Sequence, residues 1–188
     1  MPRERLDTET VVDAAVALAD AEGLESVTLA RLAAVLAVRP PSLYVHIDSL
    51  EDLRRRVGAR GARDLAAELS RAAAGRARGD ALRAVAHAYR AYGREHPGSY
   101  AAAQRARELQ QDEQAVASAA AATDVVLAVL GGYGLEGDDA VHAARTVRVA
   151  MHGFVSLEAE GGFAIDLSLD ESFERLIATL DRGLRSPE

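Results

Sequence analysis

The chain has 188 residues, which is enough for one compact domain or two closely joined small ones, and its net charge of −7 by itself argues against a nucleic-acid partner. Hydrophobic residues make up 49% and aromatic residues only 4%, so the apolar mass is mainly Ala, Leu and Val, which favours an all-α fold. The lack of cysteine excludes disulfides and thiolate metal sites, and the lack of a signal-peptide pattern or a bilayer-length apolar run predicts a cytoplasmic protein with no membrane partner.

Capping residues and glycines divide the N-terminal third of the chain into three short helical segments. The first is expected over residues 8–22, after the N-cap Asp7, because its apolar residues have the i, i+4, i+7 spacing of one helix face. The second covers residues 29–36 and has Thr28 as its cap. The third begins at the proline pair 40–41, since proline is tolerated in a first helical turn.

Longer helices are expected in the rest of the chain. One begins at Ser49 and continues to about residue 74, because Ser49 and Asp52 have the spacing of a capping box. Glycine, proline and the caps Asp80, Asp138 and Ser168 delimit the others. These cover about residues 80–95, 97–109, 112–130, 138–160 and 168–185. We therefore expect about nine helices and no strand.

Three short helices followed by a long one are typical of the helix-turn-helix architecture, in which the third helix enters the major groove of DNA. In the second segment the small Ala33 lets the next helix cross closely, and Val38 and Leu43 complete the core. Exposed residues of the third segment combine phosphate donors with side chains suited to base edges or thymine methyl groups. They are Arg39, Pro40, Pro41, Ser42, Tyr44, Val45 and His46.

The charge is unevenly distributed along the chain. Residues 53–63 contain five arginines and no acid, whereas residues 136–174 contain nine acids and two arginines. This asymmetry indicates that the N-terminal part tolerates phosphate and the C-terminal part does not.

The N-terminal residues resemble the signature of the tetracycline-repressor (TetR) family of bacterial transcriptional regulators. The resemblance covers TLARLA at 28–33, VRPPSLYVHI at 38–47 and LEDL at 50–53. It implies that Thr28 binds phosphate, that Ser42 and Tyr44 contact a base edge or the backbone, and that His46 contacts the backbone. Arg31 completes the expected DNA-binding set.

Two residues depart from the family pattern. Ala37 occupies a turn position that usually holds Gly, so it must accept an unusual backbone conformation or the turn must differ. Leu50 replaces a lysine that grips phosphate, so DNA affinity is expected to rely on the nearby arginines.

Residues 89–100 and 151–158 are similar to the family subclass named for a Trp-His-Gly motif, although this chain has no Trp. The resemblance implies a DNA-binding domain over 1–57 and a helical ligand-binding and dimerisation domain over 58–188. A ligand cavity between the middle helices would be apolar with a few polar groups. The candidates for lining it are Tyr89, Tyr92, His96, Tyr100, Met151 and His152.

In this family the last two helices form a four-helix dimer interface. Gly153 within a helix costs about 1 kcal/mol relative to Ala, and close packing of another helix would compensate. The apolar stripes beside it fit an interface, and they equally fit the core of one chain. The candidate interface residues are Val147, Gly153, Phe154, Phe173, Ile177, Leu180 and Leu184.

These patterns predict a DNA-binding transcriptional regulator. We expect a homodimeric repressor that binds a double-stranded, inverted-repeat operator and that a small-molecule effector releases. No catalytic motif or cofactor site is recognised, and the i, i+4 pair Asp138 and His142 is too small a set for a metal site, so no enzyme, cofactor or metal is expected. The alternative is a helical small-molecule-binding or enzymatic bundle with a vestigial DNA head.

Overall fold

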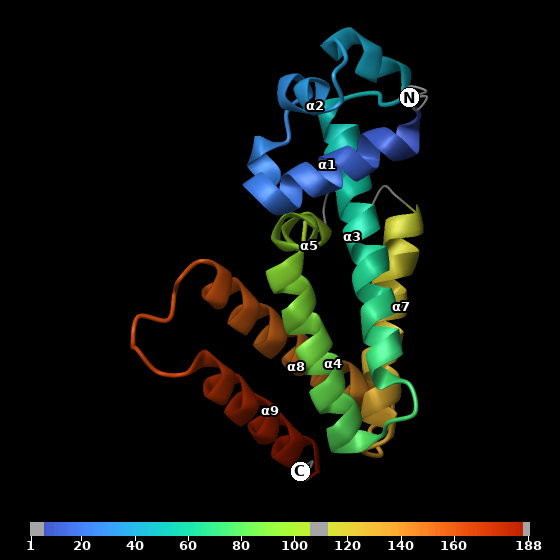
Figure 1. Cartoon of the computed structure of the whole chain (residues 1–188). Coiled ribbons are helices and arrows are strands. Elements are labelled where there is room, and N and C mark those ends of the chain that lie inside the picture. Colours follow the sequence, from blue (N-terminus) through green and yellow to red (C-terminus); the bar gives the residue numbers. More distant parts are fainter. Residues whose placement is uncertain (1–5, 106–112, 186–188) are drawn as a thin grey trace. The chain divides into compact units, whose positions relative to one another are not determined.

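The computed structural model describes residues 6–105 and 113–185, and in this part of the chain it contains eight α-helices, two 3-10 helices and no strand (Figure 1). The all-α prediction is therefore confirmed. The helices of the first half are α1 (Thr8–Glu22), η1 (Leu24–Ser26), α2 (Leu29–Val35), η2 (Pro40–Val45) and α3 (Leu50–Ala73). Those of the second half are α4 (Arg78–Glu95), α5 (Pro97–Ala103), α7 (Glu113–Gly131), α8 (Gly137–Ala159) and α9 (Leu169–Arg185).

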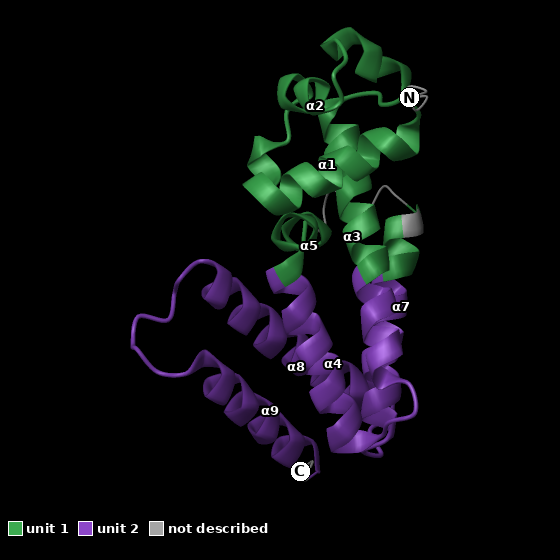
Figure 2. Ribbon diagram, viewed as in Figure 1, with its two compact units in different colours: residues 1–64, 95–118 green, residues 65–94, 119–188 purple. Residues whose placement is uncertain are grey.

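The chain divides into two compact units (Figure 2). Unit 1 comprises residues 1–64 and 95–118, and unit 2 comprises residues 65–94 and 119–188. The expected division between residues 57 and 58 differs from this one in two respects. It falls within α3, and it assigns α5 to the C-terminal domain, whereas α5 packs on α1 and belongs to unit 1.

Local capping sets the helix starts at the expected places. Asp7 caps α1, where its carboxylate accepts a hydrogen bond from the backbone N–H of Thr10 at 2.8 Å. At the start of α3 the Ser49 hydroxyl accepts from the backbone N–H of Asp52 at 3.0 Å. In a capping box the acidic side chain accepts a hydrogen bond from the backbone N–H of the N-cap residue. Here the Asp52 carboxylate accepts instead from the backbone N–H of Asp48, at 3.2 Å.

Three boundaries differ from the expectation. The helices α4 and α8 begin before Asp80 and Asp138, which therefore lie in the first turn and are not N-caps. Carboxylates in a first turn still interact favourably with the positive end of the helix dipole. The helix expected over 97–109 ends at Ala103, and its last four expected residues lie outside the described part of the chain.

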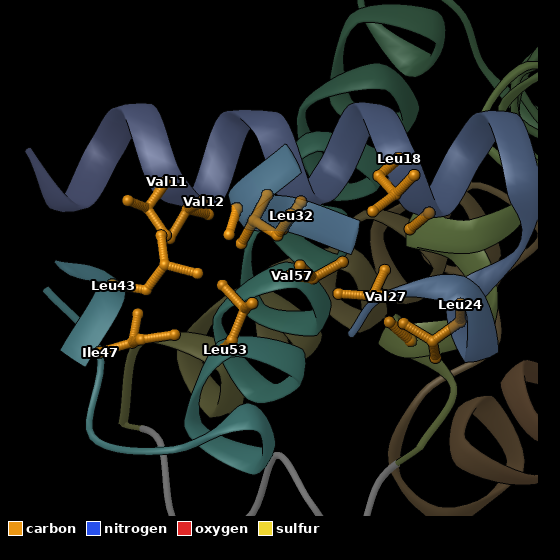
Figure 3. Close-up of a cluster of buried hydrophobic side chains, with 14 residues drawn as sticks. Val11, Val12, Leu18, Leu24, Val27, Leu32, Leu43, Ile47, Leu53 and Val57 are labelled. Atoms are coloured by element: carbon orange, nitrogen blue, oxygen red, sulfur yellow. The ribbon is translucent and has the colours of Figure 1, made fainter. Parts of the chain in front are cut away.

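The core of unit 1 holds the helix-turn-helix segment in place. Figure 3 shows side chains from α1, α2, η2 and α3 converging on one apolar cluster, with Leu43 and Ile47 directed into it. Both of these residues are buried, as are Leu32 of α2 and Leu53 of α3. Because η2 is anchored through Leu43, the residues on its other sides are left exposed.

Helix α5 completes unit 1 by a close approach to α1. A Cβ atom at Gly98 would lie 2.1 Å from the carbonyl oxygen of Ala19, so only glycine fits there. The Asp20 carboxylate accepts hydrogen bonds from the Ser99 backbone N–H at 2.7 Å and from its hydroxyl at 3.2 Å. Ala102 of α5 is buried in the same core as the helix-turn-helix residues.

Unit 2 is organised around a buried arginine. Arg90 of α4 has a side chain only 7% exposed and donates to the Glu158 carboxylate of α8 through Nε at 2.8 Å and Nη2 at 2.6 Å. Its Nη1 lies 2.8 Å from Asp170 of α9, and the rings of Phe154 and Phe173 contact the guanidinium with centroids 5.3 and 4.8 Å from Cζ. One side chain thus connects three helices. None of the described helices is long and apolar enough to cross a membrane.

Candidate nucleic-acid interface

The third helical segment of unit 1 is a 3-10 helix and not an α-helix. The Ser42 N–H donates to the Arg39 carbonyl at 2.9 Å, and the His46 N–H donates to the Leu43 carbonyl at 2.9 Å, both with i, i+3 spacing. Leu43 is buried, whereas Val45 is 80% exposed and Tyr44 is 56% exposed. The prediction of a helix at the proline pair is confirmed, and its tighter form was not expected.

The turn before this segment adopts the unusual conformation anticipated for Ala37. Its φ of +52° lies in the left-handed region, which glycine tolerates far better than alanine. The turn closes through a hydrogen bond from the Val38 N–H to the Ala33 carbonyl at 2.9 Å. The turn geometry is therefore retained without the glycine, at the cost of backbone strain.

The first residues of α2 have definite partners. The Thr28 hydroxyl oxygen accepts from the Arg31 backbone N–H at 3.2 Å, which leaves its hydroxyl proton available for an outside acceptor such as a phosphate. The Arg31 guanidinium is paired with Glu22 at 2.5 Å and holds the pKa of that carboxyl below its usual range. Arg31 would have to leave this ion pair to contact DNA.

Most arginines of unit 1 are neutralised inside the unit. Asp52, only 3% exposed, binds both Arg55 at 2.5 Å and Arg56 at 3.0 Å. The expectation that DNA affinity relies on these nearby arginines stays a prediction, and each arginine of residues 53–63 would have to leave a carboxylate partner to bind phosphate. The pairs are Arg54–Glu25, Arg55–Asp52, Arg56–Asp52, Arg60–Glu9, Arg60–Asp13 and Arg63–Asp64.

Arg39 is the exception. Among the described arginines of unit 1 it alone has no carboxylate within 4.0 Å, and it lies exposed at the N-cap of η2. A free guanidinium beside exposed hydroxyl, phenol and apolar groups matches the donor and methyl-contact chemistry of a major-groove surface. The sequence named Arg39 as a candidate but could not show that it stays unpaired, because several neutralising pairs, such as Arg54–Glu25 and Arg60–Glu9, join residues distant in sequence.

The six residues expected to line a ligand cavity are divided between the units. Tyr89, Tyr92 and Met151 are buried in unit 2, and the partly buried His152 has a pKa lowered mainly by its burial. His96 and Tyr100 belong to unit 1, where His96 Nδ1 lies 3.0 Å from Asp20.

A pocket of about 340 Å³ lies between α4 and α9 of unit 2. The sequence interpretation missed it, although its α4 residues have the i, i+3, i+4, i+7 spacing of one helix face. Its walls are largely charged, and His87 Nε2 is 2.7 Å from the Glu174 carboxylate. The lining residues are His87, Arg90, Ala91, Arg94, Asp170 and Glu174, none of which was among the six candidates.

The expected interface residues fall into three groups. Four of them are buried inside unit 2 and pack within this chain, where they stabilise the positions of α8 and α9. These are Val147, Phe154, Phe173 and Ile177. Leu180 and Leu184 are only partly buried. Gly153 has open space around it, since a Cβ there would meet nothing within 4 Å in this chain. No helix of the described part of this chain therefore packs closely against Gly153.

The pair Asp138 and His142 lies exposed on α8, and among the described residues no group of three or more His, Cys, Asp or Glu side chains lies together.

A helix-turn-helix unit combined with a helical C-terminal part is the organisation of a bacterial transcriptional regulator, and known proteins agree. Residues 82–180 match the family model described as "Tetracyclin repressor-like, C-terminal domain". The chain is 42% identical to the HTH-type transcriptional regulator Rv0681 of Mycobacterium tuberculosis, over 96% of this chain and 82% of that protein. It is 35% identical to the HTH-type transcriptional regulator YobS of Bacillus subtilis, over 97% of this chain and 95% of that protein. The chain belongs to the TetR family of transcriptional regulators.

Solved structures share the fold. A protein from Rhodococcus sp. RHA1 superposes with a TM-score of 0.82 at 21% identity, covering 99% of this chain and 100% of that one. A TetR variant from Acinetobacter baumannii AYE in complex with minocycline gives 0.68 at 24% identity, covering 97% and 99%. The relatives are transcriptional regulators and not enzymes, which agrees with the expectation for this chain.

Proposed function

We propose that this regulator is a cytoplasmic repressor that binds an inverted-repeat operator as a homodimer through residues 39–46 and leaves it when a small molecule binds. The free guanidinium of Arg39 is the observation that carries the DNA-binding part, because its neighbours in unit 1 are already neutralised. A two-fold dimer would present two equivalent recognition segments about 34–36 Å apart on one face of B-DNA.

The role of Arg39 is tested by fluorescence-anisotropy titration of operator and scrambled duplexes at several salt concentrations. If Arg39 binds a guanine, Arg39→Ala costs about 1–3 kcal/mol at one base pair and relaxes specificity there. If it binds phosphate, the salt slope falls by about one unit and the base preference is unchanged. The matched control is Arg63→Ala, because Arg63 is exposed in the same unit but paired with Asp64.

A second variant tests the rest of the surface. The Tyr44 ring can pack along the sugar-phosphate backbone and its hydroxyl can donate to phosphate, so Tyr44→Ala should weaken specific and non-specific duplexes alike. Both variants must first be shown to be folded. If Arg39→Ala and Tyr44→Ala bind operator as tightly as the parent with the same salt slope, this surface does not read DNA.

Dimerisation is proposed through α8 and α9. Along α8, Val141, Val149 and Leu157 are exposed apolar residues, and Val149 is 72% exposed. Val149 and Leu157 lie four residues before and after Gly153, so all three share one face of α8, and the open space at Gly153 leaves room for close approach of a helix from a second copy.

The interface is tested by sizing chromatography with light scattering at micromolar concentration. Val149→Arg and Leu180→Arg should each give a folded monomer with unchanged helical circular dichroism. The control is Val116→Arg on α7, which alters an exposed valine outside α8 and α9 and should leave the dimer intact. Variants at residues 149 and 180 that both stay dimeric would contradict this interface.

Release by a small molecule is proposed from the family of the C-terminal part. We expect a small, largely apolar ligand near Tyr92, Tyr100, Met151 or His152, since the two tyrosines and the histidine offer polar groups among apolar helix residues. Native mass spectrometry of the purified protein should identify a bound compound, and the same compound should lower operator affinity. A coupling of 1–3 kcal/mol corresponds to about a 5- to 150-fold loss. A compound that binds without changing DNA affinity would contradict this mechanism.

A further inference from the structure

The pocket between α4 and α9 has walls of opposite charge. His87, Arg90 and Arg94 lie on the α4 wall, and Asp170 and Glu174 lie on the α9 wall. The volume of about 340 Å³ lies at the small end of the range for ligand pockets, about 300–1,000 Å³. The pocket therefore has room for a small molecule that carries charge at more than one point.

Side-chain contacts hold the two walls in place. His87 Nε2 lies 2.7 Å from one carboxylate oxygen of Glu174, and Arg83 pairs with the other. The Arg90 side chain, only 7% exposed, lies 2.8 Å from Asp170 through Nη1. These ion pairs fix the spacing of α4 and α9, so the walls are in position before a ligand arrives, which lowers the cost of binding.

Two charged groups of the pocket still have open bonding capacity. Arg94 is exposed and makes no hydrogen bond or ion pair with any described residue, so its N–H donors are available. The Asp170 side chain is 80% exposed and its ion pair is with Arg90, although a carboxylate can accept about four hydrogen bonds. Arg94 and Asp170 form no ion pair with each other, so their charged atoms lie more than 4.0 Å apart.

A molecule that carries both a carboxylate and an ammonium group would satisfy both open charges. The planar guanidinium of Arg94 can donate two parallel hydrogen bonds to a carboxylate, and an ammonium group has donors for the Asp170 oxygens. A simple anion would be repelled by Asp170, and a simple cation would be repelled by Arg94. We infer that this pocket binds a free amino acid, with its carboxylate at Arg94 and its ammonium group at Asp170.

This amino-acid site is separate from the effector site proposed above. Its walls are charged, and none of its lining residues belongs to the set around Tyr92 and Met151, where an apolar ligand is expected. Because amino-acid binding is measured in the absence of DNA, its outcome is independent of the proposed function.

The site is tested by isothermal titration calorimetry of the full-length protein with each of the common L-amino acids. At least one of them should bind. Its N-acetyl and carboxamide derivatives have each lost one of the two charges, so each should bind at least about 10-fold more weakly, the loss that corresponds to one charged hydrogen bond. Added salt should also weaken binding, because both contacts are ionic.

Two variants locate the bound amino acid. Arg94→Gln and Asp170→Asn each remove one charge with little change in shape, and each should weaken binding at least about 10-fold. Arg94→Gln should leave the fold intact, since Arg94 has no partner among the described residues. The matched control is Arg175→Gln, because Arg175 is an exposed arginine of α9 that pairs with Glu171 and does not line the pocket.

The control should bind the amino acid as tightly as the parent does. The assignment is overturned if no amino acid binds, or if either derivative binds as tightly as the free amino acid. It is equally overturned if Arg94→Gln or Asp170→Asn binds as tightly as the parent, because the ligand then lies elsewhere.

Discussion

Gly98→Ala would perturb the contact on which α5 docks against α1. The added Cβ would lie 2.1 Å from the carbonyl oxygen of Ala19, 2.2 Å from its carbonyl carbon and 2.7 Å from its Cβ. Two of these atoms are helix backbone, which cannot rotate away as a flexible side chain can. The two helices must therefore separate by more than about 1 Å before ordinary van der Waals distances of about 3.5 Å are restored.

Two effects of opposite sign set the magnitude. Overpacking of a tight contact costs about 1–3 kcal/mol, and a clash with backbone belongs at the upper end of that range. Replacing a helical glycine by alanine returns about 1 kcal/mol of helix propensity. The separation also lengthens the hydrogen bond from the Ser99 N–H to the Asp20 carboxylate, now 2.7 Å. We expect Gly98→Ala to lower the free energy of unfolding by about 2 kcal/mol or more.

The assay is urea unfolding followed by circular dichroism, with Gly131→Ala as the matched control. Gly131 is also a helical glycine, but a Cβ there would meet nothing within 4 Å, so the control should be neutral or stabilised by up to about 1 kcal/mol. If Gly98→Ala unfolds within about 0.5 kcal/mol of the parent, the close approach of α5 to α1 is wrong, because surface-like substitutions fall in that range.

Two further predictions concern the turn and the buried ion pair. Ala37→Gly should stabilise the fold by about 0.5–1 kcal/mol in the same assay, because glycine relieves the left-handed φ of +52° at a smaller entropic cost, whereas the control Ala34→Gly within α2 should lose about 1 kcal/mol. The Arg90 hydrogen bonds hold the pKa of Glu158 below its ordinary 4.5, so the stabilisation from this pair is complete above pH 4.5 and is lost as the pH falls through the lowered pKa. In Glu158→Gln the urea midpoint of unfolding should therefore fall less steeply below about pH 4.5 than in the parent. The exposed control Glu160→Gln should behave like the parent, and an equally steep fall in Glu158→Gln would contradict this role of the pair.

Much of the secondary structure could be predicted from the sequence because it depends on near neighbours. The caps Asp7, Thr28 and Ser49 bond to backbone groups three residues away, so their spacing is visible without a fold. The positive φ of Ala37 was also foreseen as one of two outcomes, since a known turn had lost its glycine. The start of η2 at the proline pair was predicted from the local preference of proline for a first helical turn.

The partners of several charged side chains were decided only by the tertiary structure. Arg60 contacts Glu9 and Asp13 across more than forty positions of sequence, so its ion pairs could not be predicted from the run of arginines in which it lies. Arg90 is likewise buried by contacts with Glu158, 68 positions away. Burial of Leu43 of η2 on the core of unit 1 is what leaves Tyr44 and Val45 exposed on the other sides of the segment. Such long-range pairings have no local signature, because they depend on where helices distant in sequence are brought together.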